Sequence, residues 1–137
     1  MSKESFLTRR LDRGALPLVI GDVVAIVVVL SIGAFQHYET GFLLDDPVYL
    51  AAIYAPFLIG WAIMAPLVGA YSPGAVESAK ASLPLAIRSW IPAALIGVGL
   101  RWIGVFHGGA DPVFVLVMVV TGSVGIGIWR AAYFKIR

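Results

Sequence analysis

Four apolar stretches of 22 to 25 residues dominate the sequence and constrain its fold more than any other feature. They run over residues 15–36, 47–71, 83–106 and 112–134. About 20 helical residues cross the hydrocarbon core of a bilayer, and a helix pairs its backbone groups internally. The stretches therefore predict an all-α transmembrane protein, with residues 1–137 as one four-span domain. Short connections make consecutive spans antiparallel neighbours, as in a four-helix bundle.

The composition agrees with a membrane protein and excludes several other classes. Charged residues make up 13% of the chain and hydrophobic residues 60%, whereas soluble domains are about 25% charged. Disordered chains are poor in apolar residues and rich in charge, so disorder is excluded as well. The absence of cysteine rules out disulfides, iron–sulfur clusters and thiolate sites, and we expect no cofactor.

The distribution of positive charge predicts the orientation. Nine of the ten Lys and Arg residues fall on one side of the predicted spans, and Arg101 alone falls on the other, near acidic Glu39 and Asp111. Cytoplasmic segments carry the excess of Lys and Arg. We therefore expect a multi-pass protein of the cytoplasmic membrane with both termini in the cytoplasm. A nucleic-acid partner is not expected, because no basic stripe with interleaved aromatic residues is present.

Two similar halves suggest an internal repeat. Residues 16–20 (LPLVI) recur as residues 83–87 (LPLAI), and residues 46–49 (DPVY) recur as residues 111–114 (DPVF). Each half holds two spans, so the halves would be helical hairpins related by an axis along the membrane normal, which is the parallel kind of repeat. The alternative is that Pro-containing helix starts of this type arose twice by chance.

Two charges lie inside the predicted spans at similar depth. Asp22 is roughly 10 Å into the first span and Arg88 roughly 6 Å into the third, counted from the same side. Pairing lowers the cost of placing such groups in a membrane. We expect Asp22 and Arg88 to form a pair that clamps the hairpins together. A proton or anion pathway is the alternative, and Arg88 could instead extend to the interface.

A second polar group gathers on the opposite side. It consists of Arg101, His37, Glu39, His107 and Asp111. An arginine among carboxylates can hold loops together or bind an anion, and holding loops is the favoured interpretation. A metal or haem-ligand group is the weaker alternative, since metal sites need three or four converging ligands. We therefore expect no metal here.

Small and aromatic residues predict how the helices pack. The spacing of Ala93 with Gly97 and of Ser123 with Gly127 allows helices to approach closely, within the chain or against another copy. Trp61 falls in the middle of a span and should point inward. Three other tryptophans fall nearer span ends, where aromatic residues anchor at the interface: Trp90, Trp102 and Trp129.

Several short segments carry a resemblance to a known family. They are residues 56–61 (PFLIGW), residues 90–101 from Trp90-Ile91-Pro92 to Leu100-Arg101, and Trp129-Arg130, with Asp22 as an acid in the first span. Together they resemble a family of small prokaryotic four-span membrane proteins catalogued as a domain of unknown function. The resemblance implies four spans and supplies no biochemical activity.

These observations favour a structural or accessory subunit of a membrane assembly. Its partners would be the lipid bilayer and either further copies of itself or another membrane protein. The alternative is a small transporter or channel subunit that uses Asp22, Arg88 and Arg101 along one pathway. An enzyme is not expected, because the sequence contains no nucleophile–base, phosphate-loop or zinc motif.

Overall fold

The computed structural model describes residues 11–37, 39–106 and 108–137, and these residues are helical for most of their length. A short 3-10 turn, η1 (Arg13–Ala15), precedes α2 (Leu16–His37). Three further long helices follow: α4 (Pro47–Val68), α6 (Ala79–Trp102) and α7 (Pro112–Ile136). Two short helices, α3 (Thr40–Asp45) and α5 (Pro73–Glu77), lie in the connections. The four long helices are apolar enough to cross a membrane, which confirms the all-α, four-span prediction and a multi-pass membrane protein.

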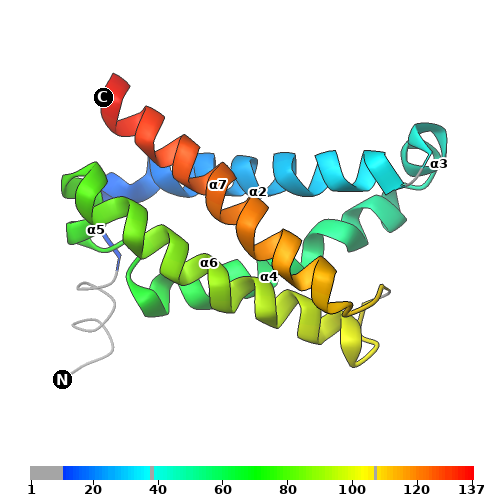
Figure 1. Ribbon diagram of the computed structural model, residues 1–137. Helices are drawn as coiled ribbons and strands as arrows, with labels where there is room; N and C mark the ends of the chain where they lie inside the picture. Colours follow the sequence, from blue (N-terminus) through cyan, green and yellow to red (C-terminus); the bar gives the residue numbers. More distant parts are fainter. Residues whose placement is uncertain (1–10, 38, 107) are drawn as a thin grey trace.

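The four long helices pack in a closed ring of neighbours. Helix α2 contacts α4 and α7, and α6 contacts the same two helices. Figure 1 shows that α4 and α6 lie side by side, while α7 crosses α2 at an angle and diverges from it toward α3. We call the end that holds α5 and the C-terminus the α5 end, and the opposite end the α3 end. Successive long helices run antiparallel, as two hairpins would, but the internal repeat stays a prediction.

Two of the helix starts follow local capping signals. The Asp46 carboxylate accepts a hydrogen bond from the amide of Tyr49 (3.0 Å) at the start of α4, and the Asp111 carboxylate accepts one from the amide of Val113 (2.8 Å) at the start of α7. In both cases proline follows the capping residue, where its missing N–H costs nothing. Both starts coincide with the predicted ones.

Three other helix bounds differ from the prediction by three residues or more. Helix α4 ends at Val68 rather than at residue 71, because Gly69 adopts a left-handed conformation (φ 100°) that terminates the helix. Helix α6 begins at Ala79 rather than at residue 83, because the Ser78 hydroxyl caps it by accepting from the amide of Ala81 (3.3 Å). It ends at Trp102, shortly before Gly104 with φ 87°.

An aromatic cluster fills the centre of the fold. The ring centroids of Trp61 and Trp90 lie 6.4 Å apart, and Phe57 is 6.4 Å from Trp90. Trp61 is buried, as predicted. The prediction that Trp90 anchors at the interface is wrong: its ring is fully buried and its indole N–H donates to the Met118 carbonyl oxygen (3.0 Å) across to α7.

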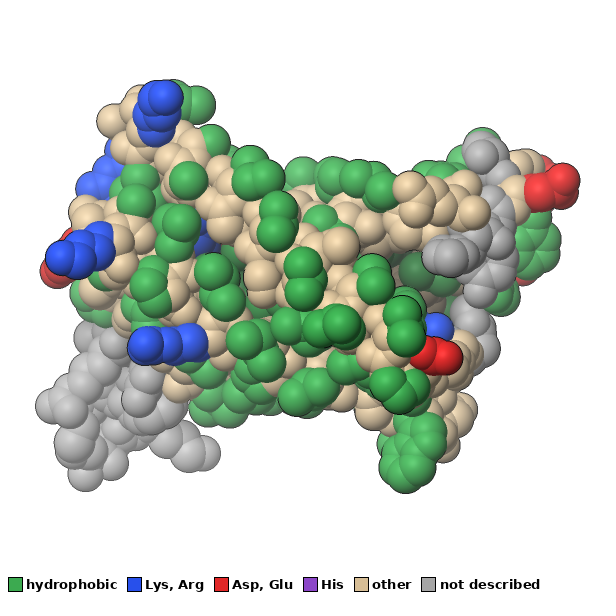
Figure 2. All heavy atoms as spheres, viewed as in Figure 1, with side chains coloured by type: hydrophobic (Ala, Val, Ile, Leu, Met, Phe, Trp, Pro, Cys, Tyr) green, Lys and Arg blue, Asp and Glu red, His purple; other side chains and the backbone are tan. Residues whose placement is uncertain are grey.

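The outward surface is apolar over the middle and charged at the ends. Figure 2 shows hydrophobic side chains across the middle of one face, with most of the visible Lys and Arg at the α5 end and most of the visible acidic side chains toward the α3 end. On α2 the exposed apolar residues recur every four positions, at Leu16, Ile20, Val24, Val28 and Ile32. Such a face is compatible with lipid and would be unfavourable in water.

Candidate functional site

A fully buried ion pair joins the first and last long helices. Asp22 of α2 and Arg130 of α7 both have an exposed side-chain fraction of 0%. Arg130 Nη2 donates to Asp22 Oδ2 (2.5 Å), and Arg130 Nε donates to Asp22 Oδ1 (3.1 Å). This two-point geometry matches the planar guanidinium to the carboxylate and fixes the angle between the two side chains.

The remaining terminal nitrogen of Arg130 bonds two further segments. Nη1 lies 3.1 Å from the carbonyl oxygen of Ala70, 2.9 Å from the hydroxyl of Ser82 and 3.3 Å from the Ser82 carbonyl oxygen. Ala70 belongs to the turn after α4, and Ser82 to the first turns of α6. We call Asp22, Arg130, Ser82 and the Ala70 carbonyl the polar clamp, because this one group connects all four long helices.

Two aromatic residues enclose the clamp. The Tyr71 ring lies 5.5 Å from the Arg130 guanidinium carbon, and its hydroxyl accepts a hydrogen bond from the Trp61 indole (2.7 Å). Burial, and the nearby negative charge of Asp22, raise the pKa of Tyr71 above its usual value. The Trp129 ring lies against Gly21, the neighbour of Asp22, and its buried Nε1 has no hydrogen-bond partner within the described ranges.

Helix length and one glycine bring the clamp together. Asp22 is six residues from the start of α2 and Arg130 is six residues from the end of α7, so each lies about 9 Å from the same end of the molecule. Beside them, Gly21 leaves room for the Trp129 ring: a methyl group at Gly21 would overlap that ring. The matching depth of Asp22 and Arg130 is visible in the sequence and marks Arg130 as a candidate partner of Asp22.

The predicted pairing of Asp22 with Arg88 is wrong. Arg88 is exposed on α6, whereas the carboxylate of Asp22 is occupied by Arg130. The physical reason is rotation about the helix axis: on the same helix Ser82, Ala86 and Ser89 face the interior, and Arg88 lies on the outward face. The outward position agrees with an arginine that extends along lipid.

The polar clamp is suited to holding helices and has no surface for exchange with solvent. Each of its charged side chains is fully buried, and the arginine N–H groups meet acceptors from three other segments. Removing one partner of the ion pair leaves an uncompensated charge inside the protein, which lowers the unfolding free energy by about 3–5 kcal/mol. The clamp therefore specifies how α2, α6 and α7 dock at this end.

The second predicted polar group lies at the α3 end, where the side chains of three of its five members are described, namely Arg101, Glu39 and Asp111. The Arg101 guanidinium carbon lies 4.3 Å from the centre of the Phe114 ring, and Arg101 packs so close to Gly108 that a methyl group there would overlap it. Asp111 is engaged in capping α7, and Glu39 is exposed. His107 and the side chain of His37 lie outside the described residues. Within the described ranges, no group of three or more potential metal ligands occurs.

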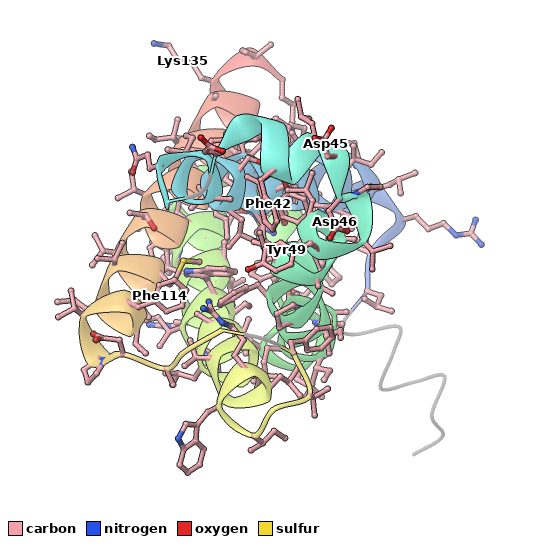
Figure 3. The ribbon with its side chains drawn as sticks, turned by 90° about the vertical axis from the view of Figure 1, so that its right-hand side faces the viewer. Phe42, Asp45, Asp46, Tyr49, Phe114 and Lys135 are labelled. Atoms are coloured by element: carbon pink, nitrogen blue, oxygen red, sulfur yellow. The ribbon has the colours of Figure 1, made fainter. Side chains whose placement is uncertain are left out.

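A cleft of about 790 Å³ opens beside Arg101. Its walls are α2 and α7, its floor comes from α4, and its polar residues are Arg101, Asp111, Gln36 and Thr121. In Figure 3, which looks at the α3 end, Phe42 of α3 and Tyr49 of α4 lie together, and Phe114, which lines the cleft, lies apart from them on α7. This cleft was not predicted from the sequence.

The predicted packing residues have different surroundings. Gly97 is buried and allows the Phe57 ring to approach, since a methyl group at Gly97 would lie 2.5 Å from that ring. Gly127 has open space around the position of its missing side chain, and Ser123 is half-buried. Gly97 therefore packs within the chain. Gly127 does not, which leaves its predicted contact with another copy or partner as a prediction.

Four apolar helices with a buried ionic clamp define a multi-pass helical membrane protein. The family model described as "Protein of unknown function (DUF3054)" matches residues 19–133. The chain belongs to this family, and the resemblance found in the sequence is confirmed. The match includes all members of the polar clamp and the residues of the cleft. No curated protein and no solved structure matches the chain.

Proposed function

We propose that this protein is a non-catalytic structural or accessory subunit of a membrane assembly. The observation that carries the proposal is the closed state of the polar clamp. Asp22 and Arg130 have no exposed surface, and they connect all four long helices at the α5 end. A group of this kind fixes a scaffold, whereas a transport site or a catalytic site needs access for its substrate.

The transporter alternative has less support. It requires Asp22, Arg88 and Arg101 to line one pathway, but Asp22 is buried near the α5 end, Arg88 lies on an outward face, and Arg101 lies at the α3 end. An Asp22→Asn variant separates the two functions. The scaffold proposal expects loss of thermal stability, while a transporter would keep its stability and lose flux in proteoliposomes.

The outward face of α7 is the surface on which we propose that a partner docks. Gly127 has open space around it and follows the half-buried Ser123 by one helical turn, a spacing that lets a second helix approach closely. Ile128, which follows Gly127, is apolar and exposed as well.

Extraction of the protein in native membrane patches tests this proposal. We expect the wild type to co-purify with a second copy or a defined membrane protein, and Gly127→Leu to lose that partner while keeping its melting temperature. Gly99→Leu is the matched control, since Gly99 on α6 also has open space. A wild-type chain that is monomeric and without a partner in these patches would refute the proposal.

We also propose that the α5 end faces the cytoplasm. Five exposed basic residues lie toward that end, namely Arg13, Lys80, Arg88, Lys135 and Arg137, in addition to the buried Arg130, while the α3 end holds Arg101 with several carboxylates. The chain has no cysteine, so single replacements report cleanly. We expect a membrane-impermeant maleimide added to intact cells to label Gly41→Cys and to leave Ser78→Cys unlabelled; the reverse pattern would refute this orientation.

A further inference from the structure

The cleft at the α3 end has the size and lining of a ligand site. Its volume is about 790 Å³, which falls in the range of 300–1,000 Å³ usual for small-molecule sites. Aliphatic and aromatic side chains make most of its wall, including Leu30 and Ile32 of α2, Phe57 of α4, and Val117 of α7. An apolar chain is therefore the natural content of its deeper part.

The crossing of α2 and α7 explains why this space is open. Toward the α5 end the two helices touch, through Asp22 with Arg130 and through Gly21 with the Trp129 ring. From there they diverge toward the α3 end, as Figure 1 shows. Gly33 widens the gap further, since nothing lies within 4 Å of the position where its side chain would be. The cleft thus follows from the fold and is bounded mainly by α2, α4 and α7.

The mouth of the cleft carries a positive charge at the depth of a membrane interface. Arg101 belongs to the last turn of α6, next to Trp102, a residue that is 76% exposed. Exposed tryptophan is enriched at the level of the lipid headgroups. The Phe114 ring lies against the guanidinium at 4.3 Å and helps to hold its orientation. Asp111 adds a carboxylate to the same lining.

We propose that this cleft binds one phospholipid, with an acyl chain between α2 and α7 and the phosphate at Arg101. The planar guanidinium can donate two hydrogen bonds to the oxygens of one phosphate. Its charge and its shape therefore both favour a phosphate-containing headgroup over an uncharged headgroup. A zwitterionic headgroup such as ethanolamine also places an ammonium group within reach of the acidic lining at Asp111.

A transmembrane helix of a partner fits this space less well than a lipid chain. A helix with its side chains is about 10–12 Å across, so a volume of about 790 Å³ would hold fewer than about two of its turns. An acyl chain is thinner and can follow the space between Gly33 and Phe57. The lipid site is separate from the partner surface proposed at Ser123, Gly127 and Ile128, because none of these three residues lines the cleft.

The test uses the purified full-length protein, reconstituted in bilayers that contain phosphatidylethanolamine and diacylglycerol with the same acyl chains. After gentle detergent transfer, native mass spectrometry measures which lipid stays bound. We expect the wild type to retain one phosphatidylethanolamine. Gly33→Phe, which fills the cleft from an open position, should lower retention about tenfold, as expected for the loss of about 1.4 kcal/mol of binding energy. Gly127→Phe should retain the lipid like the wild type.

The phosphate contact is tested separately. Arg101→Gln should lower the preference for phosphatidylethanolamine over diacylglycerol by about tenfold or more, because the hydrogen bonds between the guanidinium and the charged phosphate are lost. Equal retention by the wild type and Gly33→Phe would overturn the proposal, as would a wild type that retains both lipids equally. A second protein chain bound in the cleft would overturn it too. None of these outcomes depends on whether the Gly127 surface binds a partner.

Discussion

Asp22 and Arg130 are 108 positions apart in the chain, yet they share two parallel hydrogen bonds in the interior of the protein. The pair closes the ring of helices, because it joins the first long helix to the last. The same arginine reaches the turn after α4 and the start of α6. The single side chain of Arg130 therefore forms its full set of hydrogen bonds only when all four long helices are packed together.

The first prediction concerns this pair. Asp22→Asn leaves the Arg130 charge buried without its counter-ion, and we expect a loss of about 3–5 kcal/mol in unfolding free energy, measured by thermal or denaturant unfolding in detergent. Arg130→Met alone should also destabilise. The double variant with Asp22→Leu should be more stable than either single variant, since no isolated charge remains.

Arg88→Met serves as the control for charge loss on a long helix. Arg88 is exposed, and surface substitutions usually change stability by less than about 0.5 kcal/mol. An equal loss of unfolding free energy in Arg88→Met and Arg130→Met would contradict the role of the polar clamp. So would a double variant whose loss exceeds the sum of the losses in the two single variants.

The second prediction separates two serines on α6 that are equally buried. The Ser82 hydroxyl accepts from Arg130, whereas the Ser89 hydroxyl donates to the Leu85 carbonyl within its own helix. Ser82→Ala should cost about 1.5–3 kcal/mol, because it removes a hydrogen bond to a charged group. Ser89→Ala should have little effect, because bonds from serine back to the i−4 carbonyl do not stabilise a helix. Equal melting temperatures of the two variants would argue against the prediction.

Much of the fold was predictable because it follows from local signals. The length and apolarity of each span, the Asp-Pro starts at residues 46–47 and 111–112, and the inward position of Trp61 depend on a few neighbouring residues. The start of α6 was missed because residues 79–82 are not strongly apolar, although Ser78 is a good capping residue.

The partner of Asp22 was not predictable in the same way. Three arginines lie within or near the ends of the last two spans, and hydropathy gives their depth but not their rotation about the helix axis. Arg130 appeared to be one more basic residue at the cytoplasmic side, when its depth of about 9 Å in fact matches that of Asp22. The cleft depends on the crossing angle of α2 and α7, which no local pattern contains.

The third prediction concerns the closest approach of α4 and α6. A methyl group at Gly60 would lie 2.2 Å from the Ala93 carbonyl oxygen, which belongs to the helix backbone and cannot move aside alone. Gly60→Ala should therefore destabilise by about 1–3 kcal/mol, even though alanine favours helices over glycine. Gly99→Ala, where space is open, should instead be neutral or stabilising by up to about 1 kcal/mol. Stabilisation at both positions would show that the two helices do not approach this closely.

The last prediction concerns alkaline pH and Tyr71, whose hydroxyl accepts the Trp61 indole N–H inside the protein. The pKa of Tyr71 is raised in the folded state by burial and by the charge of Asp22. An unfolded tyrosine has a pKa of about 10. The unfolded state thus loses its proton first, so stability is retained below about pH 10 and falls as the pH rises above it. Melting temperatures measured across this range should decline less steeply for Tyr71→Phe than for the wild type.

At neutral pH the same variant should be less stable by about 1–3 kcal/mol, because the Trp61 N–H loses its acceptor. A wild-type decline no steeper than that of Tyr71→Phe would mean that the Tyr71 hydroxyl is open to solvent, and the enclosure of the polar clamp by Tyr71 would then be incorrect.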